Sequence, residues 1–309
     1  MGRTIWKQSR GYDIGRFYVD LCTRMQFSSV RIRGRENLPS SGAVILAPNH
    51  VATLMDPLVM LLTCGHVPVG FGARSDIFGN PRIARILNWL RILPLARERN
   101  GLQEVAKNYE TFDEIVDCLA HGVPFCMYSE GRHRAERGLL PVKKGIFRIA
   151  RKALDEIGGP VYVVPVGVDY EYFFNEMGRL SVQVGEPIEV GAYIRSHEGV
   201  NDAEIYRGLC ETLRERILDL LDHIPERRHD MLLPRALILL PALPLWLVLA
   251  VLSLPVWLPA RLILLRCKDK AWTHTIYFAV RFFLPVFWPF FSGFALIGNH
   301  YLNFIKDCR

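Results

Sequence analysis

Short apolar runs alternate with helix-like stretches from about residue 28 to residue 221, and this alternation limits the possible folds more than any other feature of the chain. The predicted strands cover residues 30–33, 43–47, 67–72, 125–128, 161–168 and 180–184. The predicted helices cover residues 57–64, 81–93, 102–119, 144–156 and 202–221, and Asn201 or Asp202 caps the last of them. Such alternation is typical of an α/β layer fold with a mostly parallel sheet flanked by helices.

The two ends of the chain differ from this α/β pattern. Residues 11–25 place apolar side chains mostly on one helical face, which predicts an amphipathic N-terminal segment over residues 1–27. Such a helix docks on the core or lies in a membrane interface. We divide the chain into this N-terminal segment, an α/β domain over residues 28–228, and a hydrophobic region over residues 229–309.

The hydrophobic region contains two apolar segments, residues 236–259 and 276–297. Each reaches the length of about 20 residues that a membrane-crossing helix needs. The loop between them carries four basic residues, and two full spans would move this loop across the membrane, against the positive-inside tendency. We therefore favour a helical hairpin that enters the membrane and returns. Two full spans, or a buried hairpin in a soluble protein, are the alternatives.

The charge and the cysteines narrow the classes of partner. The net charge of +7 fits either a nucleic acid or an anionic membrane surface, and the apolar segments favour the membrane lipid. The seven cysteines are scattered and form no CxxC pair, so a disulfide framework or a zinc knuckle is not expected. The sequence therefore predicts reduced thiols and an α/β domain that faces the cytoplasm, and the N-terminus lacks the apolar stretch of a signal peptide.

The candidate chemistry begins directly after the predicted strand 43–47. His50 follows Asn49 and precedes Asp56 by six positions, and no serine or cysteine nucleophile lies beside them. A carboxylate that accepts the imidazole N–H fixes the tautomer and supports the charge that develops when the ring takes a proton. Pro57 disfavours a helical conformation at Asp56, so the helix is predicted to begin at Pro57 and both side chains to share one loop. The alternatives are a hydrogen-bonded turn histidine and a helix-capping aspartate.

Basic residues follow two further apolar runs. Arg97 follows the β-like run 92–96, where an arginine is well placed for a phosphate or for solvent. The segment 128–134, with Glu130, Gly131, Arg132 and Arg134, follows a buried strand, and strand ends of this kind are where α/β folds bind ligands. Lys143 extends the basic character, as part of a phosphate site or of a solvated helix face. G-x-S-x-G, P-loop and HExxH motifs are absent from the sequence, which argues against a serine esterase, a P-loop kinase and a zinc protease.

Taken together, four ordered blocks resemble the glycerophospholipid acyltransferase family, over about residues 28–190. The blocks are residues 49–57, residues 92–97, residues 129–132 with 141–145, and residues 163–166 with 184–187. The sequence departs from the family pattern in three places. Five residues intervene between the histidine and the aspartate where four are usual, Ser129 replaces a proline, and Arg132-His133-Arg134 replaces a run such as Thr-Arg-Ser.

The resemblance implies a role for each candidate residue. His50 is the general base and Asp56 its orienting partner. The acyl-donor side includes Pro165. The expected substrate-binding residues are Asn49, Arg97, Glu130, Gly131, Arg132, Arg134 and Lys143. No metal and no bound cofactor are expected, because the acyl donor, acyl-CoA or acyl-carrier protein, is a co-substrate.

The resemblance therefore implies a membrane-associated O-acyltransferase of phospholipid biosynthesis. The favoured acceptor is 1-acylglycerol-3-phosphate, which gives phosphatidic acid. Glycerol-3-phosphate or another lysolipid or aminolipid is the nearest alternative acceptor. A membrane-anchored, non-catalytic lipid-binding protein is the alternative from a different class.

Overall fold

The structure is a computed structural model that describes residues 5–7, 9–96, 108–134, 136, 138–174, 177–225, 232–287, 289–295 and 297–298. Its strands are β1 Ser29–Arg33, β2 Ala43–Pro48, β3 Gly70–Arg74, β4 Ile92–Leu95, β5 Phe125–Cys126, β6 Val161–Tyr170, β7 Arg179–Val184 and β8 Ile188–Glu189. Its helices are α1 Arg10–Arg24, α2 Met55–Cys64, α3 Pro81–Trp89, α5 Asn108–Ala120, α6 Gly145–Ile157, α7 Val190–Ser196, α8 Asp202–Asp219, α9 Leu232–Leu252, α10 Leu254–Arg266 and α11 Thr273–Phe283. Short 3₁₀ turns are η1 Arg35–Asn37, η2 Ser75–Gly79, η4 Lys270–Trp272 and η5 Pro285–Phe287.

The strands form one mixed sheet of mostly parallel pairs. The order is β1-β7-β6-β2-β5-β3-β4, and β8 pairs with β6 off this path. The pairs of β2 with β5 and β6, of β3 with β4 and β5, and of β1 with β7 are parallel, whereas β6 is antiparallel to β7 and to β8. The predicted α/β class with a mostly parallel sheet is confirmed.

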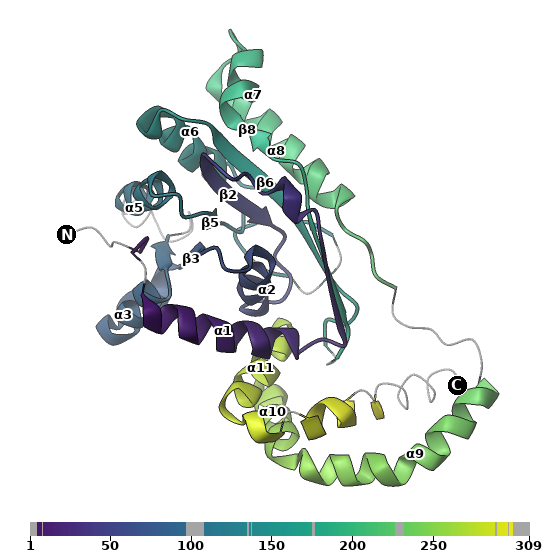
Figure 1. Cartoon of the computed structure of the whole chain (residues 1–309). Helices are drawn as coiled ribbons and strands as arrows, with labels where there is room; N and C mark the ends of the chain where they lie inside the picture. The colour runs from purple at the N-terminus through teal and green to yellow at the C-terminus, as the bar shows by residue number, and fades with distance from the viewer. Residues whose placement is uncertain are drawn as a thin grey trace.

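Helices cover both faces of this sheet, because both faces of the central strands are apolar (Figure 1). Ala43, Ile45 and Ala47 of β2 pack in one hydrophobic cluster with residues of α5, α6 and α8. Val44 and Leu46 point to the opposite face, in a cluster with residues of α2. This period-two alternation explains why all six residues of β2 are buried.

Two predicted helix bounds are wrong. The helix predicted over 81–93 ends at Trp89, because Arg91 adopts a left-handed backbone (φ 62°) and the chain enters β4. The helix predicted to begin at Pro57 begins at Met55, so Asp56 lies in its first turn, where the helix dipole favours a carboxylate. Proline is compatible with that turn because its missing N–H is not needed there. The helix predicted over 102–119 is described only as α5, from Asn108.

The N-terminal helix α1 docks on the domain and also presents apolar residues outward. Tyr12, Arg16, Cys22 and Thr23 are buried. On its outer side Ile14 and Phe17 are 74% and 72% exposed. The two interpretations of this helix from the sequence are therefore compatible, since one face packs and another remains apolar and open.

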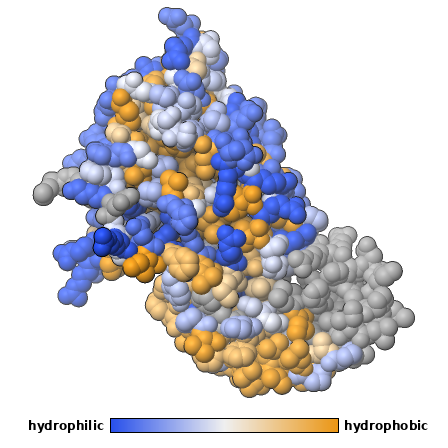
Figure 2. Space-filling model, viewed as in Figure 1, coloured by the Kyte–Doolittle hydropathy of each residue, from blue (hydrophilic) through white to orange (hydrophobic). Residues whose placement is uncertain are grey.

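The first C-terminal apolar segment forms two helices joined by a sharp bend. No single described helix is long and apolar enough to cross a bilayer, but the stretches Pro241–Leu252 and Leu254–Arg266 together are, with a bend of 73° between them. Figure 2 shows hydrophobic residues gathered over these C-terminal helices, in contrast to the mostly hydrophilic opposite end of the molecule. The first arm of the predicted hydrophobic hairpin is thus itself a bent apolar helix pair, α9 and α10.

The second apolar segment, predicted over 276–297, is not one long helix. Its described part contains α11, which ends at Phe283, the short turn η5 that begins at Pro285, and further helical residues from 289 to 295. Proline lacks the N–H that would continue the helix. In addition, α11 packs on the α/β domain, where the Tyr18 hydroxyl donates to the Phe282 carbonyl and Phe278 joins the cluster beneath the sheet.

Candidate active site

The candidate site lies where the carboxyl ends of three parallel strands meet. His50 follows the end of β2, Tyr128 and Glu130 follow the end of β5, and Tyr170 is the last residue of β6. Because β5, β2 and β6 are adjacent and parallel, these strand ends share one edge of the sheet. Ligands of open α/β sheets bind at such an edge.

The structure brings the two predicted catalytic residues together. His50 Nδ1 and Asp56 Oδ2 are 2.7 Å apart. The same carboxylate oxygen accepts the backbone N–H groups of Val51 and Ala52, each at 2.8 Å. The other oxygen, Oδ1, accepts the Tyr170 hydroxyl at 2.7 Å. Burial raises the pKa of Tyr170 well above its usual range, so this hydroxyl stays protonated and donates.

These four contacts fix the tautomer of His50. An ionised carboxylate only accepts hydrogen bonds, and Asp56 is fully buried among three other donors, so Nδ1 of His50 carries the proton. The remaining nitrogen, Nε2, is then the basic one. The His50 side chain is 17% exposed, and its ring stacks on Tyr128 with 4.2 Å between centroids. The arrangement therefore places one basic nitrogen, Nε2 of the partly exposed His50, beside the buried Asp56 at this edge of the sheet.

Glu130, predicted to bind substrate, accepts hydrogen bonds from two backbone segments. Its Oε1 accepts the His50 N–H at 2.6 Å and its Oε2 accepts the Leu140 N–H at 2.7 Å. The residue is only 5% exposed. Burial raises the pKa of Glu130, and the two N–H bonds oppose that shift. The carboxylate thus ties the loop after β5 to the backbone of the candidate base.

The predicted cationic residues lie exposed around this carboxylate. Arg132, Arg134 and Lys143 are all exposed. Arg134 pairs with Glu136 at 3.3 Å, whereas Arg132 and Lys143 have no ion pair among the described residues. Gly131 adopts a left-handed backbone (φ 72°) that turns the chain here. A Cβ atom placed on Gly131 would lie 4.0 Å from Lys143 Cγ. The predicted Arg97 lies outside the described residues.

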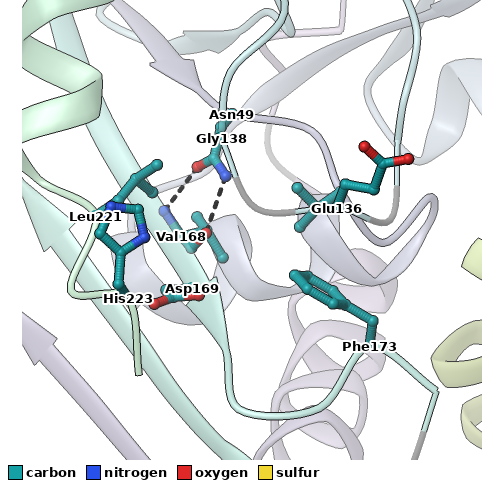
Figure 3. A pocket seen from close by; sticks show the side chains of 9 residues that line it. Asn49, Glu136, Gly138, Val168, Asp169, Phe173, Leu221 and His223 are labelled. Carbon is teal, nitrogen blue, oxygen red and sulfur yellow. Dashed lines mark hydrogen bonds between the residues drawn. The ribbon is translucent and has the colours of Figure 1, made fainter. Parts of the chain in front are cut away.

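Asn49 and Pro165 are buried in the sheet. The Asn49 side chain donates to the Val168 carbonyl at 2.9 Å and accepts from the Val168 N–H at 2.7 Å (Figure 3). Asn49 is 1% exposed, and its amide joins the end of β2 to β6. Pro165 lies inside β6 opposite Ala47, and its carbonyl accepts the Gly185 N–H at 2.9 Å.

A small open pocket lies beside these residues. Its lining includes Asn49 and Val51, the residues on either side of His50, together with Asp169 and Phe173, but His50 does not line it (Figure 3). No group of histidine, cysteine and carboxylate side chains in the described part of the chain has the arrangement of a metal site.

Three groups at the site were not foreseen from the sequence. Tyr170 is signalled in retrospect by its place at the end of the apolar run 161–168. His133 lies beside His50 with 5.5 Å between ring centroids, and its Nε2 is 2.7 Å from Asp269 Oδ2. Thr53, in a left-handed conformation (φ 47°), hydrogen-bonds Thr275 Oγ1 at 2.9 Å. The last two contacts come from the C-terminal region, and no local sequence pattern indicates them.

The geometry defines an α/β protein with a His–Asp pair at the carboxyl edge of its sheet, and comparison with known proteins agrees. A family model described as Acyltransferase matches residues 29–169, the stretch that holds His50, Asp56, Glu130 and Pro165. Residues 29–169 therefore match an acyltransferase family, as the four motif blocks predicted.

Other comparisons are more distant. No curated protein matches the chain. Among the solved structures that match is the 1-acyl-sn-glycerophosphate (LPA) acyltransferase PlsC from Thermotoga maritima. That structure is 20% identical, with a TM-score of 0.48, over 71% of this chain and 85% of the PlsC chain.

Proposed function

We propose that this chain is a membrane-associated O-acyltransferase that transfers a fatty acyl group from acyl-CoA or acyl-carrier protein to a glycerophosphate acceptor. The favoured acceptor is 1-acylglycerol-3-phosphate, and the product is phosphatidic acid. The observation that carries the proposal is the 2.7 Å contact of His50 Nδ1 with a buried carboxylate, which leaves Nε2 as a base. The family match over residues 29–169 supports acyl transfer as the reaction class.

In the proposed reaction, Nε2 of His50 takes the proton of the acceptor hydroxyl as its oxygen attacks the thioester carbonyl carbon. Asp56 stabilises the imidazolium that forms. The tetrahedral intermediate then collapses, the carbon–sulfur bond breaks, and the imidazolium returns its proton to the leaving thiolate. The acceptor is the nucleophile, so no covalent acyl-enzyme is needed.

The acceptor phosphate is proposed to bind the exposed cations beside Gly131. Arg132 and Lys143 are the favoured pair, because neither has an ion-pair partner among the described residues, whereas Arg134 already faces Glu136. A guanidinium binds a phosphate by two parallel hydrogen bonds, and an ammonium adds a point charge. Arg97 remains a candidate by its place in the motif. Asn49 and Glu130 are assigned positioning roles, and Pro165 is kept on the acyl-donor side.

Membrane attachment is proposed through the bent apolar pair α9–α10. Val251 and Leu265 are 64% and 79% exposed, and on α1 Phe17 is 72% exposed. The basic residue Arg266 ends α10, and Lys268 and Lys270 follow it, so an anionic lipid surface complements this end of the helix. The acyl products of the reaction are themselves membrane lipids, so an anchored enzyme stays beside its substrate. We place the protein at the inner membrane with its α/β domain in the cytoplasm.

A purified-enzyme assay tests the reaction. Glycerol-3-phosphate and 1-acylglycerol-3-phosphate are offered separately, each with acyl-CoA and with acyl-carrier protein. His50→Ala is compared with His121→Ala, an exposed histidine directly after α5. We expect acylation of 1-acylglycerol-3-phosphate that His50→Ala abolishes and His121→Ala preserves. Wild-type acylation by the His50→Ala protein would disprove the assigned base. Acylation of glycerol-3-phosphate alone would move the proposal to the alternative acceptor.

Vesicle flotation tests the attachment. Val251→Glu with Leu265→Glu should reduce binding of the full chain to anionic vesicles. Val200→Glu, which charges an exposed apolar residue next to α8, serves as the matched control and should bind as wild type does. Unchanged binding of the double variant would show that another surface, such as that of α1, holds the protein on the membrane.

A further inference from the structure

Residues 269–275, at the junction of α10 and α11, make three contacts with residues that surround the His50–Asp56 pair. We name this segment the strap. It comprises Asp269, the 3₁₀ turn η4 Lys270–Trp272, and the first residues of α11, Thr273 to Thr275. Ala271, Thr273, His274 and Thr275 are each at most 5% exposed. Burial of this extent indicates that the strap packs against other parts of the protein.

The first contact of the strap is with the loop that carries the candidate base. Thr275 Oγ1 is 2.9 Å from Thr53 Oγ1, and the Ala271 carbonyl is 3.4 Å from the same hydroxyl. Thr53 lies between His50 and Asp56 and adopts a left-handed conformation (φ 47°). A β-branched residue is strained there and keeps that conformation only when its surroundings impose it. The strap supplies this restraint.

The second contact is through the tyrosine that binds Asp56. The His274 ring stacks on the Tyr170 ring at 5.5 Å between centroids, and His274 Nε2 is 2.8 Å from the Tyr172 carbonyl. The Tyr170 hydroxyl in turn donates to Asp56 Oδ1. His274 therefore limits the position of a donor that holds the carboxylate.

The third contact is with the loop that carries the proposed phosphate-binding cations. Asp269 Oδ2 is 2.7 Å from His133 Nε2, and Asp269 Oδ1 accepts the Ala271 N–H at 3.0 Å, which fixes the carboxylate within the strap. The hydrogen bond from His133 lowers the pKa of Asp269. His133 lies between Arg132 and Arg134 in sequence, and its ring meets His50 edge-on. Asp269 thus ties the cation loop to the same segment that restrains Thr53.

We infer that the strap is a positioning element of the active site, and that Asp269 and Thr275 align the acceptor-binding loop and the base-bearing loop with each other. This inference rests on the proposed acyl transfer. Its consequence is that the apolar C-terminal region does more than attach the enzyme to a membrane, since removal of that region also removes support from the catalytic pair.

The Thr275–Thr53 contact should affect kcat, and the Asp269–His133 contact should affect the acceptor KM. Thr275→Val keeps the shape of the side chain and removes the restraint on Thr53, so it should lower kcat about fivefold with little change in the acceptor KM. Asp269→Ala releases the cation loop, so it should raise the acceptor KM about fivefold with little change in kcat. Asp269→Ala combined with His133→Ala should cost no more than either single change, because both remove the same contact.

Matched controls separate positioning from ordinary stability. Thr23→Val removes another buried threonine hydroxyl, whose one bond among the described residues is to the Val19 carbonyl of its own helix. Asp117→Ala removes an Asp–His pair at the end of α5, with His121, together with the hydrogen bond from Trp6 Nε1. Both controls should lower thermal stability by amounts comparable with the strap variants while kcat and the acceptor KM stay at wild-type values. Strap variants with the kinetics of these controls would overturn the inference.

Amide hydrogen exchange gives a readout that does not depend on activity. In the full chain, Thr275→Val should speed exchange in residues 50–56 and Asp269→Ala should speed exchange in residues 130–134, relative to the two controls. Wild-type exchange in both loops would also overturn the inference. A wild-type protein that acylates no glycerophosphate acceptor would instead refute the proposed function, and the exchange experiment would still decide whether the strap restrains these loops.

Discussion

Replacing Asp56 by asparagine should separate the charge of this side chain from its hydrogen bonds. Three donors converge on Oδ2, namely His50 Nδ1 and the backbone N–H groups of Val51 and Ala52. An asparagine carbonyl oxygen can take that position, and its amide group can then donate to the Tyr170 oxygen at the other. The backbone donors thus dictate which way the amide lies, and they keep His50 in its working tautomer.

The Asp56→Asn protein should therefore keep the acceptor at Oδ2 and remain folded, while it loses the charge and the acceptor of the buried Tyr170 hydroxyl. An imidazolium and a carboxylate about 4 Å apart attract by ~4 kcal/mol at an effective dielectric constant of about 20. That energy corresponds to a fall in kcat of about 10³-fold. Asp56→Ala, in contrast, leaves two buried N–H groups and the Tyr170 hydroxyl without their acceptor, at ~1–3 kcal/mol each. That total approaches the whole stability of many domains, so the alanine variant should be poorly folded.

Thermal denaturation and single-turnover acylation of the two variants measure these effects. Tyr170→Phe is the control for the loss of one donor and should cost about 1 kcal/mol of stability while the His50–Asp56 contact remains. The reasoning is refuted if Asp56→Asn unfolds as readily as Asp56→Ala. It is equally refuted if Asp56→Asn retains kcat within tenfold of the wild type.

Three further outcomes are expected. Glu130→Gln turns one side-chain oxygen into a donor that faces a backbone N–H, so it should lower both the free energy of unfolding, by ~1–3 kcal/mol, and kcat. Urea denaturation and an acylation assay measure the two effects, and wild-type stability would contradict the role of Glu130 as a double acceptor. Arg132→Ala should raise the acceptor KM more than Arg134→Ala does, because Arg134 already pairs with Glu136. If steady-state kinetics show the larger rise in KM for Arg134→Ala, the phosphate contact is reassigned to Arg134. Burial raises the pKa of the Cys64 thiol to about 12, above the value of about 8.5 for an unfolded thiol, so the native thiol should resist alkylation at pH 8. The free energy of unfolding should fall as pH rises above about 8.5, because only the unfolded thiol ionises there. Rapid alkylation of native Cys64, measured by mass spectrometry, would contradict its burial.

The parts of this protein that the sequence predicted are those specified by neighbouring residues. Strands such as β2 and β6 follow from unbroken β-branched and apolar runs, which are typical of strands buried on both faces. The contact of His50 with Asp56 spans six positions and needs only one loop between a strand and a helix. The start of α2 was misplaced because the preference of a residue before proline was outweighed by the helix dipole and by the two N–H groups that hold Asp56.

The parts that could not be predicted depend on contacts between distant residues. Glu130 reaches the backbone of His50 across 80 positions, Tyr170 reaches Asp56 across 114, and Asp269 reaches His133 across 136. Periodicity predicts which elements form, but it does not specify which side chains meet at the sheet edge. For the same reason Glu130 looked like a substrate ligand, since a carboxylate beside two arginines has the same sequence pattern whether it faces outward or inward.

The left-handed backbone of Thr53 bears on how the spacing of a catalytic motif can vary. A single residue in this conformation reverses the local direction of the chain and takes up length without moving either neighbour on the loop. The loop between His50 and Asp56 therefore holds five residues while the two side chains stay in contact. A search for related enzymes that demands a fixed count between base and acid would pass over chains of this kind, whereas a search based on the distance between the two groups would retrieve them.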